Sequence, residues 1–263
     1  MIDTHCHILP KFGYLDTDTI IQNANKAGVT KMISIGCDYE DIEETIKLSE
    51  KYKGIIFASL GLHPECVKLD SNIDEMFEKF KAIIQNNLNK IIAIGECGLD
   101  YHFSNDPIIH NKQKKLFKKQ IELCIDIQKP LIIHTRDAWE DTFNLLDQTD
   151  FKNKQLGYFE IKDTNTSQIN KTILIETGIV HSFTGGILEA NESIKRGFKL
   201  GINGIITFKN SNIIREAVKS VGIGHVVFET DSPFLSPEPF RGQTNEPARV
   251  KEIAEFVKKL LDI

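Results

Sequence analysis

The chain lacks several features that mark specialised classes of protein. Its five cysteines are scattered and odd in number, and no CxxC pair occurs, which favours reduced intracellular thiols over a disulfide framework. No apolar run reaches the roughly 18 residues that a membrane span needs. No charged and then apolar leader opens the chain, so we expect no signal peptide. These absences predict a cytoplasmic protein that does not enter a membrane.

The chain also has no excess of positive charge, with 32 Lys and Arg residues against 37 Asp and Glu. The net charge of −5 at pH 7 argues against broad electrostatic capture of duplex nucleic acid. It does not exclude an enzyme that acts on nucleic acid, because a compact site with divalent metals can bind a few phosphates locally. The remaining composition, with 41% hydrophobic and 26% charged residues, is ordinary for a globular protein.

Short apolar runs alternate with longer amphipathic segments along the whole chain. The runs are typical of strands buried on both faces of a parallel sheet, and the segments between them have helical periodicity. The candidate strands are 1–3, 31–35, 55–59, 90–94, 131–133, 178–180, 198–201 and 225–228, and the candidate helices are 17–27, 41–51, 74–87, 110–128, 138–147, 188–195, 212–220 and 246–261. This alternation predicts one α/β domain over residues 1–263, a (β/α)8 TIM barrel, with a doubly wound sheet as the main alternative.

Residues 152–171 interrupt this alternation between the fifth helix and the sixth strand. The segment is rich in Asn, Lys, Thr, Gln and Asp and has little periodicity. We interpret it as a surface insertion outside the barrel core, containing a short hairpin around residues 156–161. A loop of this length is either functional or merely tolerated, and we favour the second interpretation.

Histidines and carboxylates gather at the ends of the predicted strands. His5 and His7 are one residue apart, so they project from the same face of an extended strand, and imidazole binds zinc and similar divalent metals. The other polar residues at strand ends are His63, Glu96, His134, His181 and Asp231. In a barrel these positions converge at the carboxyl ends of the strands, where active sites lie.

The types of these residues fit one kind of chemistry. Histidines and carboxylates can together hold two divalent ions about 3.5–4 Å apart, with one carboxylate as the bridge. Glu96 is the best bridge because strand four lies midway around the barrel, and Asp231 fits the acceptor of a proton from a shared water. Taken singly, each residue has a structural interpretation, such as a capped histidine, an ion-pair partner or the start of a turn. Their joint placement favours a metal site.

Seven motifs in this sequence closely resemble the TatD family of metal-dependent deoxyribonucleases. They are His5-x-His7, Gly61-Leu62-His63-Pro64, residues 95–101, His134-x-Arg136, residues 181–185, residues 229–233 and residues 241–247. They follow one another at family-like spacings from residue 1 to about residue 260. The resemblance implies an amidohydrolase-like TIM barrel, divalent metals and phosphodiester hydrolysis. It implies six metal ligands, His5, His7, Glu96, His134, His181 and Asp231, and it places His63 near the scissile phosphate.

Two features depart from that family. The 152–171 insertion is longer than we expect for bacterial members, which bears on substrate access rather than on the chemistry. Gln243 stands where many members carry Lys, which removes one positive charge from the rim of the site. We therefore expect more reliance on Arg136 and Arg241, whose planar guanidinium groups can pair with phosphate.

We predict a divalent-metal-dependent nuclease, a 3′-5′ exonuclease on single-stranded or frayed DNA, because a deep cup admits one strand end more readily than a duplex. The catalytic residues are Asp231, Glu96 and His63, and the substrate-binding residues are His63, Arg136 and Arg241. The cofactor is two divalent ions, Mg²⁺ or Mn²⁺ in activity with Zn²⁺ as an alternative. The partner is DNA, and the protein is a monomer. Four aromatic residues could stack on a base, although each also fits the core: Tyr101, Phe183, Phe208 and Phe240.

Three other functions stay open from the sequence. The same scaffold hydrolyses amides and cyclic amides, but many such barrels use a carboxylated lysine after strand four, where this chain has Glu96. Hydrolysis of an ester on a modified tRNA, or of a small phosphoester, is a second alternative. A non-catalytic metal-binding protein is the third, and the intact set of ligands argues against it.

Overall fold

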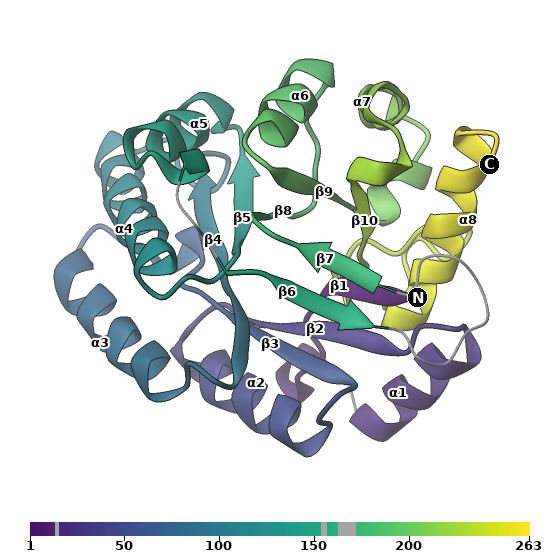
Figure 1. Ribbon diagram of the computed structural model, residues 1–263, viewed down its shortest axis with the longest axis horizontal. Helices are drawn as coiled ribbons and strands as arrows, with labels where there is room; N and C mark the ends of the chain where they lie inside the picture. Colours follow the sequence, from purple (N-terminus) through teal and green to yellow (C-terminus); the bar gives the residue numbers. More distant parts are fainter. Residues whose placement is uncertain (14–15, 154–156, 163–171) are drawn as a thin grey trace.

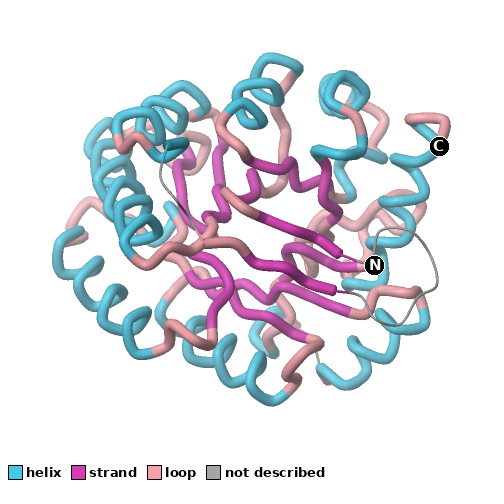
Figure 2. Tube along the Cα trace, viewed as in Figure 1, coloured by secondary structure: helices cyan, strands magenta, loops and turns pink. Residues whose placement is uncertain are grey.

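A computed structural model describes residues 1–13, 16–153, 157–162 and 172–263 of the chain. Its centre is a sheet of eight parallel strands in the order β1-β2-β3-β4-β5-β8-β9-β10. A parallel bridge from Cys6 to Ser232, just beyond the last strand, joins the two edges and closes the sheet. Figure 1 shows the helices as an outer ring, and Figure 2 shows the strands inside it. The predicted TIM barrel is confirmed.

Each candidate strand and helix corresponds to an element of the barrel. The strands are β1 Ile2–Cys6, β2 Lys31–Gly36, β3 Ile56–Leu60, β4 Ile91–Asp100, β5 Leu131–Arg136, β8 Gly178–Val180, β9 Phe198–Ile202 and β10 Val226–Phe228. The helices are α1 Thr17–Lys26, α2 Tyr39–Lys51, α3 Ile73–Asn86, α4 Pro107–Asp126, α5 Trp139–Gln148, α6 Ile187–Lys195, α7 Asn212–Val221 and α8 Val250–Leu260. No helix in the described part of the chain is long and apolar enough to cross a membrane.

Local sequence accounts for where several helices begin. The side chains of Asp16 and Asp38 accept hydrogen bonds from backbone N–H groups in the first turns of α1 and α2. A helix leaves these first N–H groups without partners, and a short acidic side chain at the preceding position satisfies them. Each helix then packs its apolar face on the sheet, where Phe80 of α3 and Phe117 of α4 are fully buried.

Strand β4, which carries Glu96, runs further than its apolar run predicts. The apolar run of β4 ends at Ile94, yet the strand continues to Asp100. The ladder to β5 persists there, with Gly98 opposite His134 and Asp100 opposite Arg136. A strand ends where its backbone pairing ends, so a polar side chain that faces a buried site does not stop it.

A hairpin lies across the amino end of the barrel (Figure 1). Strand β6 (Phe159–Lys162) pairs in antiparallel fashion with β7 (Thr172–Ile175). Phe159, Ile161 and Ile175 are buried in one cluster with apolar side chains near the beginnings of the barrel strands. The strands that contribute to this cluster include β1, β5, β8 and β10, through Ile2, Ile132, Ile179 and Val227.

This hairpin corrects our interpretation of residues 152–171. Phe159 and Ile161 are 6% and 1% exposed, so the prediction that the segment lies outside the barrel core is wrong for both. Alternate residues of a strand share one face, and in β6 that face is apolar although the segment as a whole is polar. The partner strand β7 begins only after the insertion ends, and residues 154–156 and 163–171, including part of the hairpin expected around 156–161, lie outside the described residues.

Candidate metal centre at the carboxyl end of the barrel

The carboxyl ends of the strands surround a cup of about 780 Å³. Most of the predicted site residues line it: His7, His63, Glu96, His134, Arg136, His181 and Asp231. His5 lies beneath them, with none of its surface exposed. Side chains from the first and last strands of the chain therefore meet in one place, as the barrel requires.

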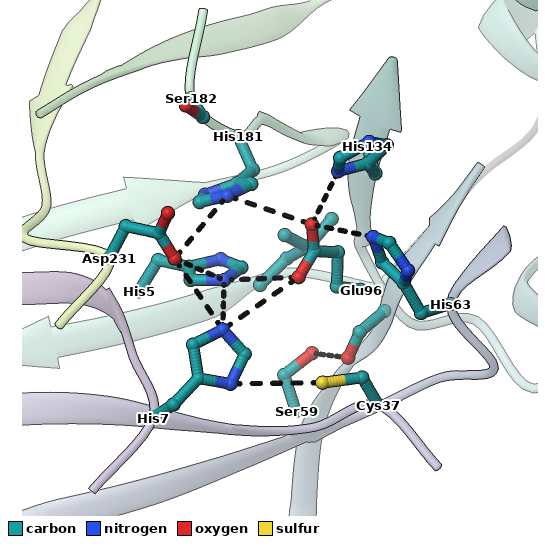
Figure 3. A network of polar contacts seen from close by, with 12 residues as sticks. His5, His7, Cys37, Ser59, His63, Glu96, His134, His181, Ser182 and Asp231 are labelled. Atoms are coloured by element: carbon teal, nitrogen blue, oxygen red, sulfur yellow. Dashed lines mark hydrogen bonds and ion pairs between the residues drawn. The ribbon is translucent and has the colours of Figure 1, made fainter. Parts of the chain in front are cut away.

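Glu96 lies at the centre of the cup, between two groups of imidazoles (Figure 3). Its Oε2 atom is 3.3 Å from Nε2 of His5 and 4.0 Å from Nε2 of His7. Asp231 joins this group, because its Oδ1 atom is 3.5 Å from Nε2 of His7 and 3.9 Å from Nε2 of His5. The two Nε2 atoms are 3.3 Å apart. One carboxylate oxygen of Glu96 thus faces two imidazoles and a second carboxylate.

The other oxygen of Glu96 faces a different group. Oε1 is 2.7 Å from Nδ1 of His134, and it is 3.6 Å from Nε2 of both His63 and His181. His181 also reaches toward the first group, since its Nε2 atom lies 3.8 Å from Oδ1 of Asp231. Glu96 therefore faces one cluster of donor atoms with each of its carboxylate oxygens.

Two glycines in β4 let this strand lie close enough to β5 for Glu96 to face the axis. A Cβ atom on Gly95 would lie 2.3 Å from the carbonyl oxygen of Ile132, and one on Gly98 would lie 1.9 Å from that of His134. Both glycines have positive φ angles, 134° and 152°, which disfavour other residues. The Gly-Glu-Cys-Gly sequence thus combines the central carboxylate with the backbone approach that positions it.

Three further side chains contact the imidazoles from behind. Oε1 of the fully buried Glu229 is 2.9 Å from Nδ1 of His181, and it also accepts a hydrogen bond from the backbone N–H of Ser182. Oδ2 of Asp100 is 3.0 Å from Nε2 of His134. The thiol of Cys37 is 3.7 Å from Nδ1 of His7.

Such outer partners fix the orientation of an imidazole, and a ligating histidine almost always has one. We assigned no role to these three residues from the sequence. The sequence offered a reason to consider Glu229 and Asp100, because both are acidic residues in the same motifs as Asp231 and Glu96. It offered none for Cys37.

Glu96 and Asp231 are ionised despite their burial. Burial favours the neutral form of Glu96, but His181, His5 and His63 outweigh it and hold its pKa well below the ordinary value. Burial likewise opposes ionisation of Asp231, and His181 and His7 lower its pKa below the usual range. At both carboxylates, the effect of nearby positive charge on the pKa exceeds the effect of desolvation.

His134 and His181 show the complementary effect. Burial favours the neutral form of His134, but Asp100 and Glu96 outweigh it and raise its pKa to about 9. For His181, burial is outweighed by Glu229, Glu96 and Asp231, and its pKa is also about 9. Protons therefore balance the buried negative charge of the metal-free protein.

The donor set fits divalent metal ions. His5, His7 and Glu96 bring ligand atoms within 4.8 Å of one another, and so do His63, Glu96 and His134. A third group with the same spacing contains His5, His181 and Glu229. Imidazole nitrogens with carboxylate oxygens suit zinc and other first-row metals, and the first two groups share Glu96 as a bridging carboxylate would.

The two arginines predicted to bind substrate lie in different places. Arg136 is exposed and lines the cup. Arg241 is exposed as well, but it is not among the described residues that line the cup, and its guanidinium lies 4.3 Å from the ring centre of Phe208. A role for Arg241 in phosphate binding stays a prediction.

Comparison with known proteins shows the family of this chain. Residues 2–263 match the family model described as TatD related DNase. The chain belongs to this TatD family. YabD of Bacillus subtilis, named an uncharacterized metal-dependent hydrolase, is 33% identical over the whole of this chain and 92% of its own length. YjjV of Escherichia coli K12, which carries the same description, is 28% identical over 96% of this chain and 86% of its own length.

Solved TatD structures share the barrel. The crystal structure of E. coli YjjV, described as a TatD homolog, superposes with a TM-score of 0.81 and covers 99% of this chain and 90% of its own. A TatD family hydrolase from Entamoeba histolytica superposes with a TM-score of 0.77 at 20% identity, covering 100% of this chain and 92% of its own. At that identity the second likeness shows the fold alone.

Proposed function

We propose that this TatD-family protein is a divalent-metal-dependent phosphodiesterase that removes nucleotides from the 3′ end of single-stranded or frayed DNA. The observation that carries the proposal is the position of Glu96, whose two carboxylate oxygens face separate groups of donor atoms. The description of relatives as metal-dependent hydrolases, and of the family as DNases, supports the reaction class and the substrate.

Two groups of residues would hold the ions. His5, His7 and Asp231 would hold one ion together with Oε2 of Glu96, and His134 and His181 would hold the other together with Oε1. Divalent ions bound there would polarise a phosphoryl oxygen and lower the pKa of a water molecule toward neutrality. Glu229, Asp100 and Cys37 act as positioning residues, because each fixes one imidazole from behind.

Asp231, His63 and Arg136 act on the attacking water and on the substrate. Asp231 is ionised at neutral pH, since its pKa is below the usual range, and it lines the cup, so it accepts the proton of the attacking water. His63 lines the cup beside Glu96 and contacts the scissile phosphate. Arg136, exposed at the rim, pairs with a phosphate oxygen through its guanidinium group.

The experiment is hydrolysis by purified protein with Mg²⁺ or Mn²⁺, using a linear single strand with a free 3′ end and a closed circle of the same sequence. We expect the linear strand to be degraded and the circle to persist. The Asp231→Asn variant, purified in parallel, controls for contaminating nucleases and should be inactive. Equal rates on both strands would leave an endonuclease, and no cleavage of either strand together with amide hydrolysis would overturn the assignment.

A further inference from the structure

Two phenylalanine rings form an apolar corner at the mouth of the otherwise polar cup. Phe12 follows β1 in a short 3-10 helix (Pro10–Phe12), and Phe234 follows β10, the neighbour of β1 across the closure of the barrel. Both line the cup. Their ring centres are 6.2 Å apart with an interplanar angle of 84°, and the ring centre of Phe12 is 5.2 Å from that of His7. The corner therefore adjoins the proposed metal ligands directly.

The exposure of Phe234 is imposed by the backbone of its loop. Half of the residue is exposed, 50%, although it is large and apolar. Its N–H donates to the carbonyl of Asp231, and its own carbonyl accepts a hydrogen bond of 2.6 Å from the side-chain amide of Asn245. Asn245 is fully buried and also donates to the carbonyl of Thr230. This asparagine belongs to the 241–247 motif, and it holds the loop that presents the ring.

The positive charge of Lys11, next to the corner, is already paired with carboxylates. Lys11 lies over the ring of Phe12, with Nζ 5.1 Å from the ring centre. The same Nζ is paired with Asp41 and lies 3.2 Å from Oδ2 of Asp38. With two carboxylates as partners, Lys11 is not a phosphate anchor, so the corner suits a flat, uncharged group.

The opposite side of the cup carries the arginine. Arg136 ends β5, which is four positions from β1 in either direction around the ring of eight strands. A chain of nucleotides presents flat bases on one side and phosphates on the other. A strand end lying across the cup can therefore place a base against the aromatic corner while its backbone extends toward Arg136.

We propose that Phe12 and Phe234 bind the unpaired base of a nucleotide that flanks the scissile phosphodiester. The inference rests on the proposed phosphodiesterase activity and names the group that the enzyme recognises. The base stacks on one ring and meets the other ring edge to face. A base in a duplex is unavailable for this contact, so the corner selects single-stranded or frayed ends.

Phe12 and Phe234 line the cup, and none of the four aromatic residues considered from the sequence is among the described residues that line it. Phe183 is buried, Tyr101 stacks on His110, and Phe208 and Phe240 each lie under an arginine.

The test compares single-stranded oligonucleotides that carry either a normal nucleotide or an abasic one at each of the two positions flanking the cleaved bond. We expect the wild-type enzyme to prefer the normal substrate over one of the abasic substrates by about 10-fold in kcat/KM, mostly through KM. Phe234→Ala should lose this preference, and Phe234→Trp should retain it. Tyr158→Ala removes a 68% exposed aromatic residue beside β6, outside the cup, and should match the wild type.

Three outcomes would count against the inference. Equal rates of the active wild type on normal and both abasic substrates would overturn it, and so would a Phe234→Ala variant that slows all substrates alike, which indicates a structural effect. Absence of phosphodiester hydrolysis by the wild type would instead overturn the proposed function, and this inference with it. A preference lost only in Phe234→Ala is the supporting result.

Discussion

The two ends of this barrel are built from the same strands and have opposite chemistry. At the amino end, Phe159 and Ile161 of the hairpin pack on apolar side chains such as Ile132, and the cluster is closed to solvent. At the carboxyl end, Glu96 and Glu229 are buried at 4% and 0% exposure among imidazoles. One end stabilises the fold by burying apolar area, and the other holds charges whose burial is unfavourable unless they are paired.

The difference shows how the fold tolerates such a site. A buried carboxylate without partners would cost several kcal/mol, and here Glu96 faces several imidazoles while Glu229 is paired with His181. The apolar end supplies stability that does not depend on the cup. We therefore expect substitutions at the amino end to change the free energy of unfolding and those at the carboxyl end to change metal binding and activity.

The largest expected effect is on the stability of the amino end. Phe159→Ala removes a side chain that is 6% exposed and leaves a cavity against the strands, so it should lower the free energy of unfolding by about 3–5 kcal/mol. Chemical denaturation of the metal-free protein measures it. Tyr158→Ala, at the exposed neighbouring position, should change it by less than about 0.5 kcal/mol. Equal effects of the two substitutions would mean that the hairpin does not close the barrel.

The second effect is on the carboxyl end. Glu96→Gln keeps the shape of the side chain but removes the charge shared by both donor groups, so the more weakly bound ion should be lost and activity should fall at least about 10²-fold. Metal analysis and hydrolysis rates measure this, with Glu255→Gln at an exposed position of α8 as the matched control. Near-normal activity with two ions bound would refute the bridging role.

A smaller effect is expected at Glu229, which contacts the proposed ligand His181 and is not a proposed ligand itself. Glu229→Gln weakens the group that fixes His181, and the loss of an outer partner lowers metal affinity by about 10-fold. Calorimetric titration of the metal-free variant with Mn²⁺ provides the measurement, and Glu255→Gln again serves as the control. An unchanged affinity would show that the backbone alone orients this imidazole.

The pH dependence of metal binding tests the charge balance at the carboxyl end of the barrel without any substitution. In the metal-free protein the pKa values of His134 and His181 are about 9, so both imidazoles hold a proton at neutral pH and must release it to ligate. Metal affinity should therefore rise with pH by about tenfold per unit for each proton released, and level off above about pH 9. Titration calorimetry in buffers of different ionisation enthalpy counts the protons. An affinity that is constant from pH 7 to 9 would contradict this charge balance.

The strand–helix alternation predicted the barrel, and the barrel predicted which residues meet at its carboxyl end. Glu96 and Asp231 are 135 positions apart in the numbering, yet each follows an apolar run, and parallel strands of a barrel point the same way. This inference needed only the order of elements and the types of side chain. The family resemblance added the assignment of individual ligands.

The features that the sequence did not predict depend on the path of short segments. The apolar positions of β6 and β7 are few and are separated by a polar stretch, so their pattern could not be distinguished from that of a loop. The aromatic corner depends on how the loops after β1 and β10 turn, and Phe234 faces the cup because Asn245 holds its loop. Long-range contacts of this kind leave no periodic signal.

The most direct test of the account is to locate the ions in crystals grown with Mn²⁺, using its anomalous scattering. We predict two peaks about 3.5–4 Å apart on either side of Glu96, one beside His5 and His7 and the other beside His134. No peak should occur at the amino end near the hairpin. A single peak bound only by His5, His7 and Asp231, with Glu96 bound to no ion, would contradict the claim that this carboxylate bridges two ions.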